Sequence, residues 1–287
     1  MARAVRCVWP ARAALGEGPV WDRRDNCLYF VDIKGQTLHR LNLDSDARQS
    51  WPMPEPLCWA IPRAHLPGFI AGFKSGVAGL SLDPLTIKPL LAPEPERRTN
   101  RLNDAKADRF GRVWFGSMDD EEQIVSGALY RLGHDLSCKR MDDGYAIANG
   151  PTFSVDGSRF YHTDTGRKTI YVFDVAEDGS LSNKRTFVRF EDAAWDSPDG
   201  MTVDAEGGVW VAHWGGARIS RFTPDGALDR SIALPVSQIT SCVFVGPALD
   251  RMFVTSAAIG REEEPLAGAL FEVDPGVRGA PAFTFGG

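Results

Sequence analysis

The chain has 287 residues, of which 43% are hydrophobic and 24% charged, as in a soluble globular protein large enough to bury a core without disulfides. Its 32 basic and 38 acidic side chains give a net charge of −6 without a basic stripe, which argues against nucleic-acid binding. Because no apolar run resembles a secretion signal or approaches the roughly 20 residues of a membrane helix, we expect a cytoplasmic protein that does not bind membranes.

Short runs of strand-forming residues recur along the whole chain. Their first residues are separated by 40, 44, 47, 49 and 43 positions, and the six runs are Leu28–Asp32, Gly68–Gly72, Arg112–Gly116, Arg159–Thr163, Gly208–Ala212 and Arg251–Thr255. Each is followed by a second strand-like run that ends in a turn, and turns rich in Asp and Gly precede several of them. A period of this length is typical of the blades of a β-propeller.

These repeats predict an all-β protein in which residues 1–287 form one six-bladed β-propeller, each blade a four-stranded antiparallel sheet. A single blade cannot bury both of its faces, but blades stacked around an axis cover one another and leave only short edges. We expect the N-terminal stretch Val5–Pro10 to add a strand to the last blade and close the ring, and the protein to be a monomer. A pair of open β-sandwiches is the alternative, but sandwiches do not repeat at this period.

One place in the repeat carries an unexpected set of polar side chains. The innermost strand of each unit should precede the Asp/Gly turn, and near its start four units have Glu17, Asn103, Asn149 and Asp199, while the other two have Trp59 and Ser241. Ring symmetry should bring these positions together at one end of the axis. Two carboxylates placed together need a cation, a shared proton or a basic partner, and an oxygen-only set suits calcium, magnesium or manganese. The alternative is that Asn-Gly and Asp-Gly are ordinary turn signals here.

Several motifs resemble one known family. The segments LGEGPVWDRRDNCLYFVDI, RLNDAKADRFGRVWFGSM, NGPTFSVDG, FYHTDT and SPDGMTVDAEGGVWVAHWGG are similar to those of the senescence-marker-protein/gluconolactonase family, which includes regucalcin and bacterial sugar lactonases. Within that family the resemblance is strongest to bacterial pentonolactone hydrolases such as xylonolactonase. The resemblance implies a six-bladed propeller with a single divalent ion, which is calcium, zinc, manganese or iron in different members.

The resemblance also assigns residues. It implies that Glu17, Asn149 and Asp199 hold the metal, and that Arg101 and Asn103 contact the substrate. A substrate-side glutamate falls in GSMDDEEQ, where Glu121 is our choice and Glu122 the alternative.

These assignments predict the metal-dependent hydrolysis of a sugar-acid lactone, a pentonolactone such as xylonolactone or arabinonolactone, to the free sugar acid. Asp199 would take the proton from the attacking water. Two alternatives stay open: another metal-dependent ester or phosphotriester hydrolase, and a calcium-binding propeller without enzymatic activity. The polar pair Arg101 and Asn103 suits a hydroxylated sugar better than an apolar phosphotriester.

Other conspicuous side chains have simpler interpretations. We expect Trp59 and Trp214 to be candidates for the wall of the pocket because of their place in the repeat. His162 and His213 follow strand cores, and we interpret them as packed or hydrogen-bonded rather than as ligands.

Overall fold

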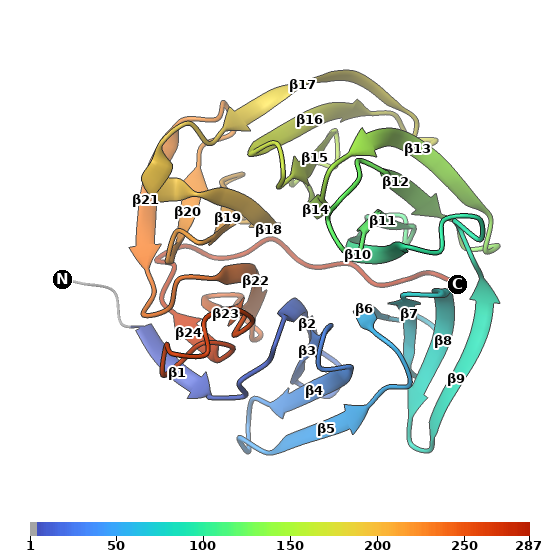
Figure 1. Cartoon of the computed structure of the whole chain (residues 1–287), viewed down its shortest axis with the longest axis horizontal. Coiled ribbons are helices and arrows are strands. Elements are labelled where there is room, and N and C mark those ends of the chain that lie inside the picture. Colours follow the sequence, from blue (N-terminus) through green and yellow to red (C-terminus); the bar gives the residue numbers. More distant parts are fainter. Residues whose placement is uncertain (1–4) are drawn as a thin grey trace.

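The computed structural model describes residues 5–287 as six four-stranded antiparallel sheets, arranged as blades around a common axis (Figure 1). Blade 1 comprises β2 (Gly16–Asp22), β3 (Cys27–Asp32), β4 (Thr37–Asn42) and β5 (Arg48–Pro52). Blade 2 comprises β6 (Leu57–Pro62), β7 (Phe69–Phe73), β8 (Gly76–Leu82) and β9 (Leu85–Leu91). Blade 3 comprises β10 (Asn100–Ala107), β11 (Val113–Asp119), β12 (Gly127–Leu132) and β13 (Cys138–Tyr145).

The second half of the ring repeats the pattern. Blade 4 comprises β14 (Ala148–Phe153), β15 (Arg159–Asp164), β16 (Thr169–Val175) and β17 (Leu181–Arg189). Blade 5 comprises β18 (Ser197–Val203), β19 (Val209–Trp214), β20 (Arg218–Phe222) and β21 (Leu228–Ala233). Blade 6 comprises β22 (Ile239–Val245), β23 (Arg251–Ser256), β24 (Leu270–Val273) and β1 (Val5–Trp9). The predicted six-bladed architecture is therefore confirmed.

Blade 6 is built from both ends of the chain. β1 pairs antiparallel with β24, with Val5 opposite Val273 and Arg6 opposite Glu272. The Arg6 side chain also donates to Glu272 Oε2 at 2.5 Å. This pairing is consistent with the expectation that an N-terminal strand closes the ring.

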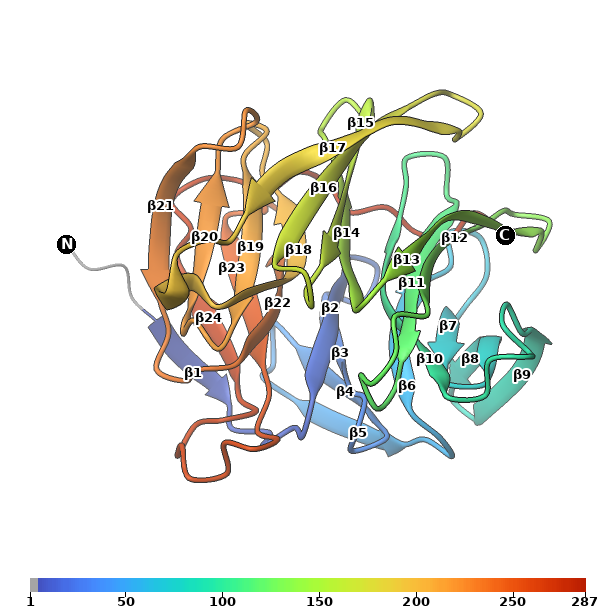
Figure 2. The ribbon, with the colours of Figure 1, turned by 45° about the horizontal axis from the view of Figure 1, so that its top comes forward.

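Burial decreases from the axis outwards. The first strand of each blade packs against the first strands of the two neighbouring blades, and β6 and β22 are buried throughout. The fourth strands, such as β5, β9, β17 and β21, lie at the periphery and expose most of their residues (Figures 1 and 2). The predicted position of the first strand as the innermost one is confirmed. It explains why this strand can carry side chains toward the axis.

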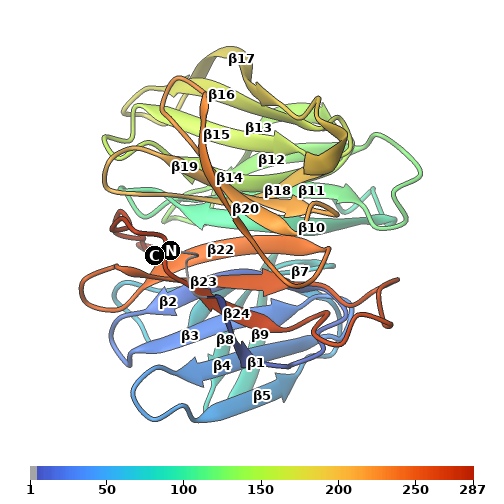
Figure 3. The same cartoon turned by 90° about the vertical axis from the view of Figure 1, so that its left-hand side faces the viewer.

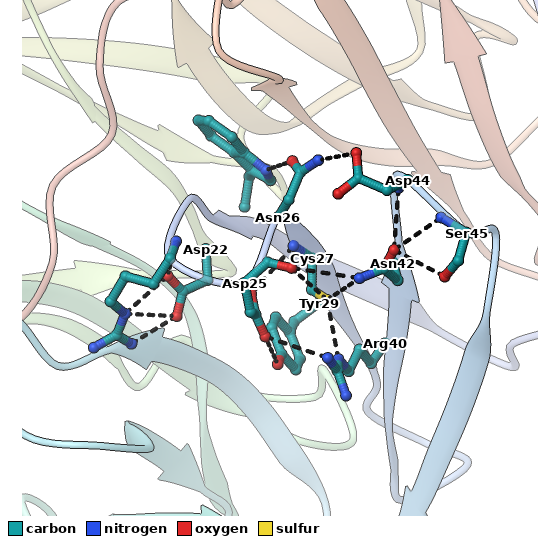
Figure 4. A network of polar contacts seen from close by, with 11 residues as sticks. Asp22, Asp25, Asn26, Cys27, Tyr29, Arg40, Asn42, Asp44 and Ser45 are labelled. Carbon is teal, nitrogen blue, oxygen red and sulfur yellow. Dashed lines mark hydrogen bonds and ion pairs between the residues drawn. The ribbon is translucent and has the colours of Figure 1, made fainter.

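Polar turns fix the strand ends of blade 1 at the end away from Glu17 (Figure 4). Asn26 accepts a hydrogen bond from Trp21 Nε1 at 3.0 Å and donates to Asp44 at 2.8 Å. The Tyr29 hydroxyl donates to the Asp25 carboxylate at 2.8 Å. The β2–β3 and β4–β5 turns are therefore held to each other by side chains.

The C-terminal segment, residues 278–287, crosses the same end of the propeller (Figure 1). Its backbone bonds to blades 5 and 6 through Ala205 and Leu249, and to blades 2 and 3 through Pro62 and Gly111. Phe285, in this segment, is fully buried. The side view in Figure 3 shows the C-terminal end of the chain at one face of the ring. Within residues 5–287 the helical content is the short turn Ala193–Trp195, so no described helix could span a bilayer.

Candidate functional site

A break in strand pairing recurs near the start of the first strand of every blade. There the register between the first and second strands shifts, at Glu17/Val20, Leu57/Trp59, Leu102/Ala105, Asn149/Thr152, Pro198/Met201 and Ile239/Ser241. A bulge of this kind interrupts the ladder of backbone hydrogen bonds locally and changes the direction of the neighbouring side chains. The polar residues selected by their place in the repeat therefore share a structural position as well as a sequence position.

Glycines next to two of these residues are required by the backbone. Gly18 and Gly150 have φ values of 52° and 46°, in the left-handed region that glycine adopts without steric cost. A Cβ atom on Gly150 would also lie 2.4 Å from the carbonyl oxygen of Asp199. The Asn-Gly sequence thus allows blade 4 to approach blade 5 closely at the site.

The structure brings five of the six predicted site residues to the wall of one cavity of about 310 Å³. These are Glu17, Arg101, Asn103, Asn149 and Asp199. Glu122 also lines this cavity, whereas Glu121 is exposed and is not part of its wall. Apolar contacts around the polar group come from Leu15, Met118, Ile147 and Trp214. The volume suits a small molecule.

Two acids at the site are buried close to each other. Glu17 is 5% exposed and Asp199 is 3% exposed. Burial, followed by the charge of Asp104, raises the pKa of Glu17 to about 8. Burial and the nearby charges of Glu17 and Asp104 raise the pKa of Asp199 well above its usual range. Asn149 lies beside them, and its Nδ2 donates to Asp199 Oδ1.

Asp104 is a third buried acid that the sequence interpretation missed. It is 5% exposed, and its Oδ1 accepts from the backbone of Ala105 at 2.7 Å. Its Oδ2 is buried without a hydrogen-bond partner among residues 5–287. Strand alternation would put Asp104 on the opposite face from Asn103, but the bulge between Leu102 and Ala105 interrupts that alternation. The sequence did contain one indication that Asp104 belongs to the site, namely its position directly after Asn103 in the motif RLND.

The predicted substrate pair forms a connected polar wall in blade 3. Arg101 Nη1 donates to Asn103 Oδ1 at 2.5 Å and to the carbonyl of Leu102 at 3.0 Å. Asn103 Nδ2 donates to the carbonyl of Ala148 at 2.9 Å. Arg101 and Asn103 are each 4% exposed, so both are held in place by the blade rather than extended into solvent.

The donors present fit a hard divalent cation. In the described chain no three His, Cys, Asp or Glu side chains are grouped as metal ligands, so a ligand set here needs a further oxygen donor, and the carboxamide of Asn149 lies on the same cavity wall. Glu17, Asn149 and Asp199 together could supply two carboxylates and one carboxamide oxygen. A cation among them would offset the repulsion between the buried acids, including the unpaired Oδ2 of Asp104.

The aromatic and histidine predictions have mixed outcomes. Trp214 lines the cavity, but Trp59 is 1% exposed and packs against Phe115 with ring centroids 5.5 Å apart, so its placement at the pocket wall was wrong. His162 and His213 are fully buried as expected, and burial lowers their pKa values to about 3 and about 4.

A larger hollow of about 1120 Å³ opens at the opposite end of the propeller, beside the C-terminal segment. Its wall includes Trp21, Arg109, Phe110, His134 and Phe283, and none of the predicted site residues. Volume alone would favour this hollow as the functional site, but the buried acids lie at the other end of the propeller.

Fold and site together define a six-bladed propeller with an acid-lined cavity at one end of its axis. The chain belongs to the SMP-30/gluconolactonase/LRE-like family, whose model matches residues 15–258. It is 38% identical over 260 residues to L-arabinolactonase of Azospirillum brasilense, covering 89% of this chain and 85% of that protein. It is 32% identical over 296 residues to regucalcin of Oryctolagus cuniculus, covering 99% and 98%. A solved luciferin-regenerating enzyme superposes with a TM-score of 0.94 at 31% identity, covering 99% of this chain and all of that one.

Proposed function

We propose that this protein is a metal-dependent sugar lactonase that hydrolyses the lactone of a five-carbon sugar acid, such as xylonolactone or arabinonolactone. One observation carries the proposal: two buried carboxylates and a carboxamide share a cavity with the polar pair Arg101 and Asn103. The similarity to an L-arabinolactonase supports a lactone substrate.

Each residue has a role in this proposal. Glu17, Asn149 and Asp199 would hold a divalent ion, which when bound supplies Lewis-acid polarisation of the lactone carbonyl. Asp199 would accept the proton of the attacking water, because it is a buried carboxylate on the cavity wall that Asn149 holds in place. Arg101 and Asn103 hold the sugar hydroxyls and fix the ring for attack, with Glu121 or Glu122 as a further contact. Glu122 is favoured over Glu121 by its place on the cavity wall.

A calcium-binding propeller without enzymatic activity is the second candidate. It is favoured by the 32% identity to regucalcin over nearly the whole chain. This candidate requires a site that binds calcium but turns over no aldonolactone. The polar wall of Arg101 and Asn103 supports the lactonase instead, since metal storage alone would not need it.

The deciding experiment is acid release from a panel of xylono-, arabinono- and gluconolactones by the purified protein. The assay is run on the chelated protein and again after calcium, zinc, manganese or iron(II) is added back. The lactonase proposal expects turnover of at least one lactone that is lost on chelation and restored by a metal. Calcium binding without turnover of any lactone would favour the second candidate, and full activity after chelation would refute the metal's role. The monomeric state and the cytoplasmic location stay predictions.

A further inference from the structure

Asp120 joins three cationic side chains from three blades. It follows directly after β11 in blade 3, and its side chain is 9% exposed. Arg101 Nε donates to its Oδ1 at 2.9 Å. Lys34, between β3 and β4 of blade 1, donates to the same oxygen at 2.8 Å, and Lys74, between β7 and β8 of blade 2, donates to Oδ2 at 2.7 Å.

The contact between Arg101 and Asp120 is buried and therefore differs from an ordinary surface ion pair. The Arg101 side chain is 4% exposed, whereas Lys34 and Lys74 are 33% and 36% exposed. Exposed pairs contribute little, but a buried charge that loses its partner is strongly destabilised. The two lysines provide charge that keeps Asp120 ionised: burial alone would raise its pKa, but Lys34, Lys74 and Arg101 together lower it to about 2.

The geometry of the guanidinium gives this contact a directional effect. Asp120 binds Nε of Arg101, while Nη1 of the same planar group donates to Asn103 and to the Leu102 carbonyl. Contacts at both ends of a planar fork fix its rotation as well as its position. Without Asp120, Arg101 would lose its acceptor at Nε and would face two unneutralised lysines.

We propose that Asp120 is a positioning residue that sets the orientation of Arg101 on the cavity wall, with Lys34 and Lys74 anchoring it from blades 1 and 2. The inference rests on the proposed function, in which Arg101 contacts the sugar hydroxyls. Asp120 itself is not on the cavity wall, so its effect on the substrate passes through Arg101.

The test compares Asp120→Asn, Arg101→Ala and the double variant, using the lactone that the wild-type protein hydrolyses best. Asp143→Asn is the matched control, since it removes an exposed acid of the same blade whose partner Arg140 is also exposed. We expect Asp120→Asn to raise KM about tenfold, with kcat changed less than threefold and the control unchanged. If Asp120 acts through Arg101, adding Asp120→Asn to Arg101→Ala should raise KM by less than twofold. A wild-type KM in Asp120→Asn, or effects that multiply in the double variant, would overturn the proposal.

A crystal structure of Asp120→Asn gives a second readout that needs no activity. We expect the Arg101 guanidinium to leave its contact with Asn103, and an unmoved guanidinium would overturn the proposal. If the wild-type protein hydrolyses no lactone, the proposed function fails while this structural readout still decides the role of Asp120. Should Asp120→Asn not fold, Asp120→Glu keeps the charge but displaces it by one methylene, and the same movement of Arg101 is expected.

Discussion

Asn149 donates a hydrogen bond from its carboxamide nitrogen to Oδ1 of Asp199, across the boundary between blades 4 and 5. A second contact at 3.3 Å links Asn149 to the hydroxyl of Thr165, which itself donates to the carbonyl of Pro198 at 2.8 Å. Residues of blade 4 thus donate hydrogen bonds both to the carboxylate of Asp199 and to the carbonyl of Pro198, the residue before it. Asp199 is therefore held in one orientation at the cavity, which its proposed role as a base acting on a bound water requires.

Replacing Asp199 should remove turnover. We expect Asp199→Asn to lower kcat by about 10²–10⁴-fold, the usual contribution of a general base. The measurement is acid release at saturating lactone, with the metal content of the same sample determined by elemental analysis. Loss of activity with metal retained would assign the effect to proton transfer. A fully active Asp199→Asn variant would remove this residue from the mechanism.

Replacing Arg101 should act mainly on substrate binding. A hydrogen bond to a charged group contributes about 1.5–3 kcal/mol, so Arg101→Ala should raise KM by roughly 10- to 100-fold with a smaller change in kcat. Steady-state kinetics over a range of lactone concentrations checks this. A large fall in kcat at unchanged KM would contradict a binding role and would place Arg101 in the chemical step.

Removing the charge of Asp104 should stabilise the protein in the absence of metal. Its carboxylate is buried near Glu17 and Asp199, and its Oδ2 lacks a partner in the described chain. We expect Asp104→Asn to raise the free energy of unfolding of the chelated protein by about 1 kcal/mol, because a neutral amide replaces a buried acid whose charge opposes the ionisation of Glu17 and Asp199. Thermal unfolding in chelator, with and without added metal, measures the effect. A destabilised chelated variant would show that the repulsion is already relieved by other groups.

His162 should make the fold sensitive to acid. It lies between the rings of Tyr145 and Phe160, neither ring nitrogen has a hydrogen-bond partner among residues 5–287, and burial lowers its pKa from 6.5 to about 3. Below pH 6.5 His162 is therefore protonated in the unfolded chain but stays neutral in the folded chain. The free energy of unfolding consequently falls as the pH drops from 6.5 toward 3. Between pH 7.5 and pH 5 this histidine should account for about 2 kcal/mol of lost stability.

His162→Leu tests that contribution. Urea unfolding at the two pH values should show a drop about 2 kcal/mol smaller than in the wild-type protein. His65→Leu, which removes an exposed imidazole, is the control and should keep the wild-type pH dependence. Equal pH dependence in His162→Leu and the wild-type protein would show that other groups set the acid sensitivity.

The fold could be predicted from the sequence because the blades repeat. The candidate metal ligands could be predicted because they recur at one position in the repeat. The role of Asp120 could not be predicted: Lys34 and Lys74 lie in equivalent turns of blades 1 and 2, but their contact with an acid of blade 3 is a contact between blades that the repeat does not specify. The choice between Glu121 and Glu122 depended on a loop conformation. There Glu122 has a positive φ of 57°, and the Asp119 side chain accepts from the backbone of Gln123 at 2.8 Å. Neither feature follows from strand periodicity.

The pairing of Val5 with Val273 has a consequence for synthesis on the ribosome. Blades 1 to 5 are each continuous in the chain and can form as they emerge, but β1 must wait for β24 before it has a neighbour. Until then β1 and β24, both of blade 6, have unpaired strand edges, which are sites for association with other chains. Closure of the ring is therefore a late step of folding, and the open ring can associate with other chains until β24 is available to pair with β1.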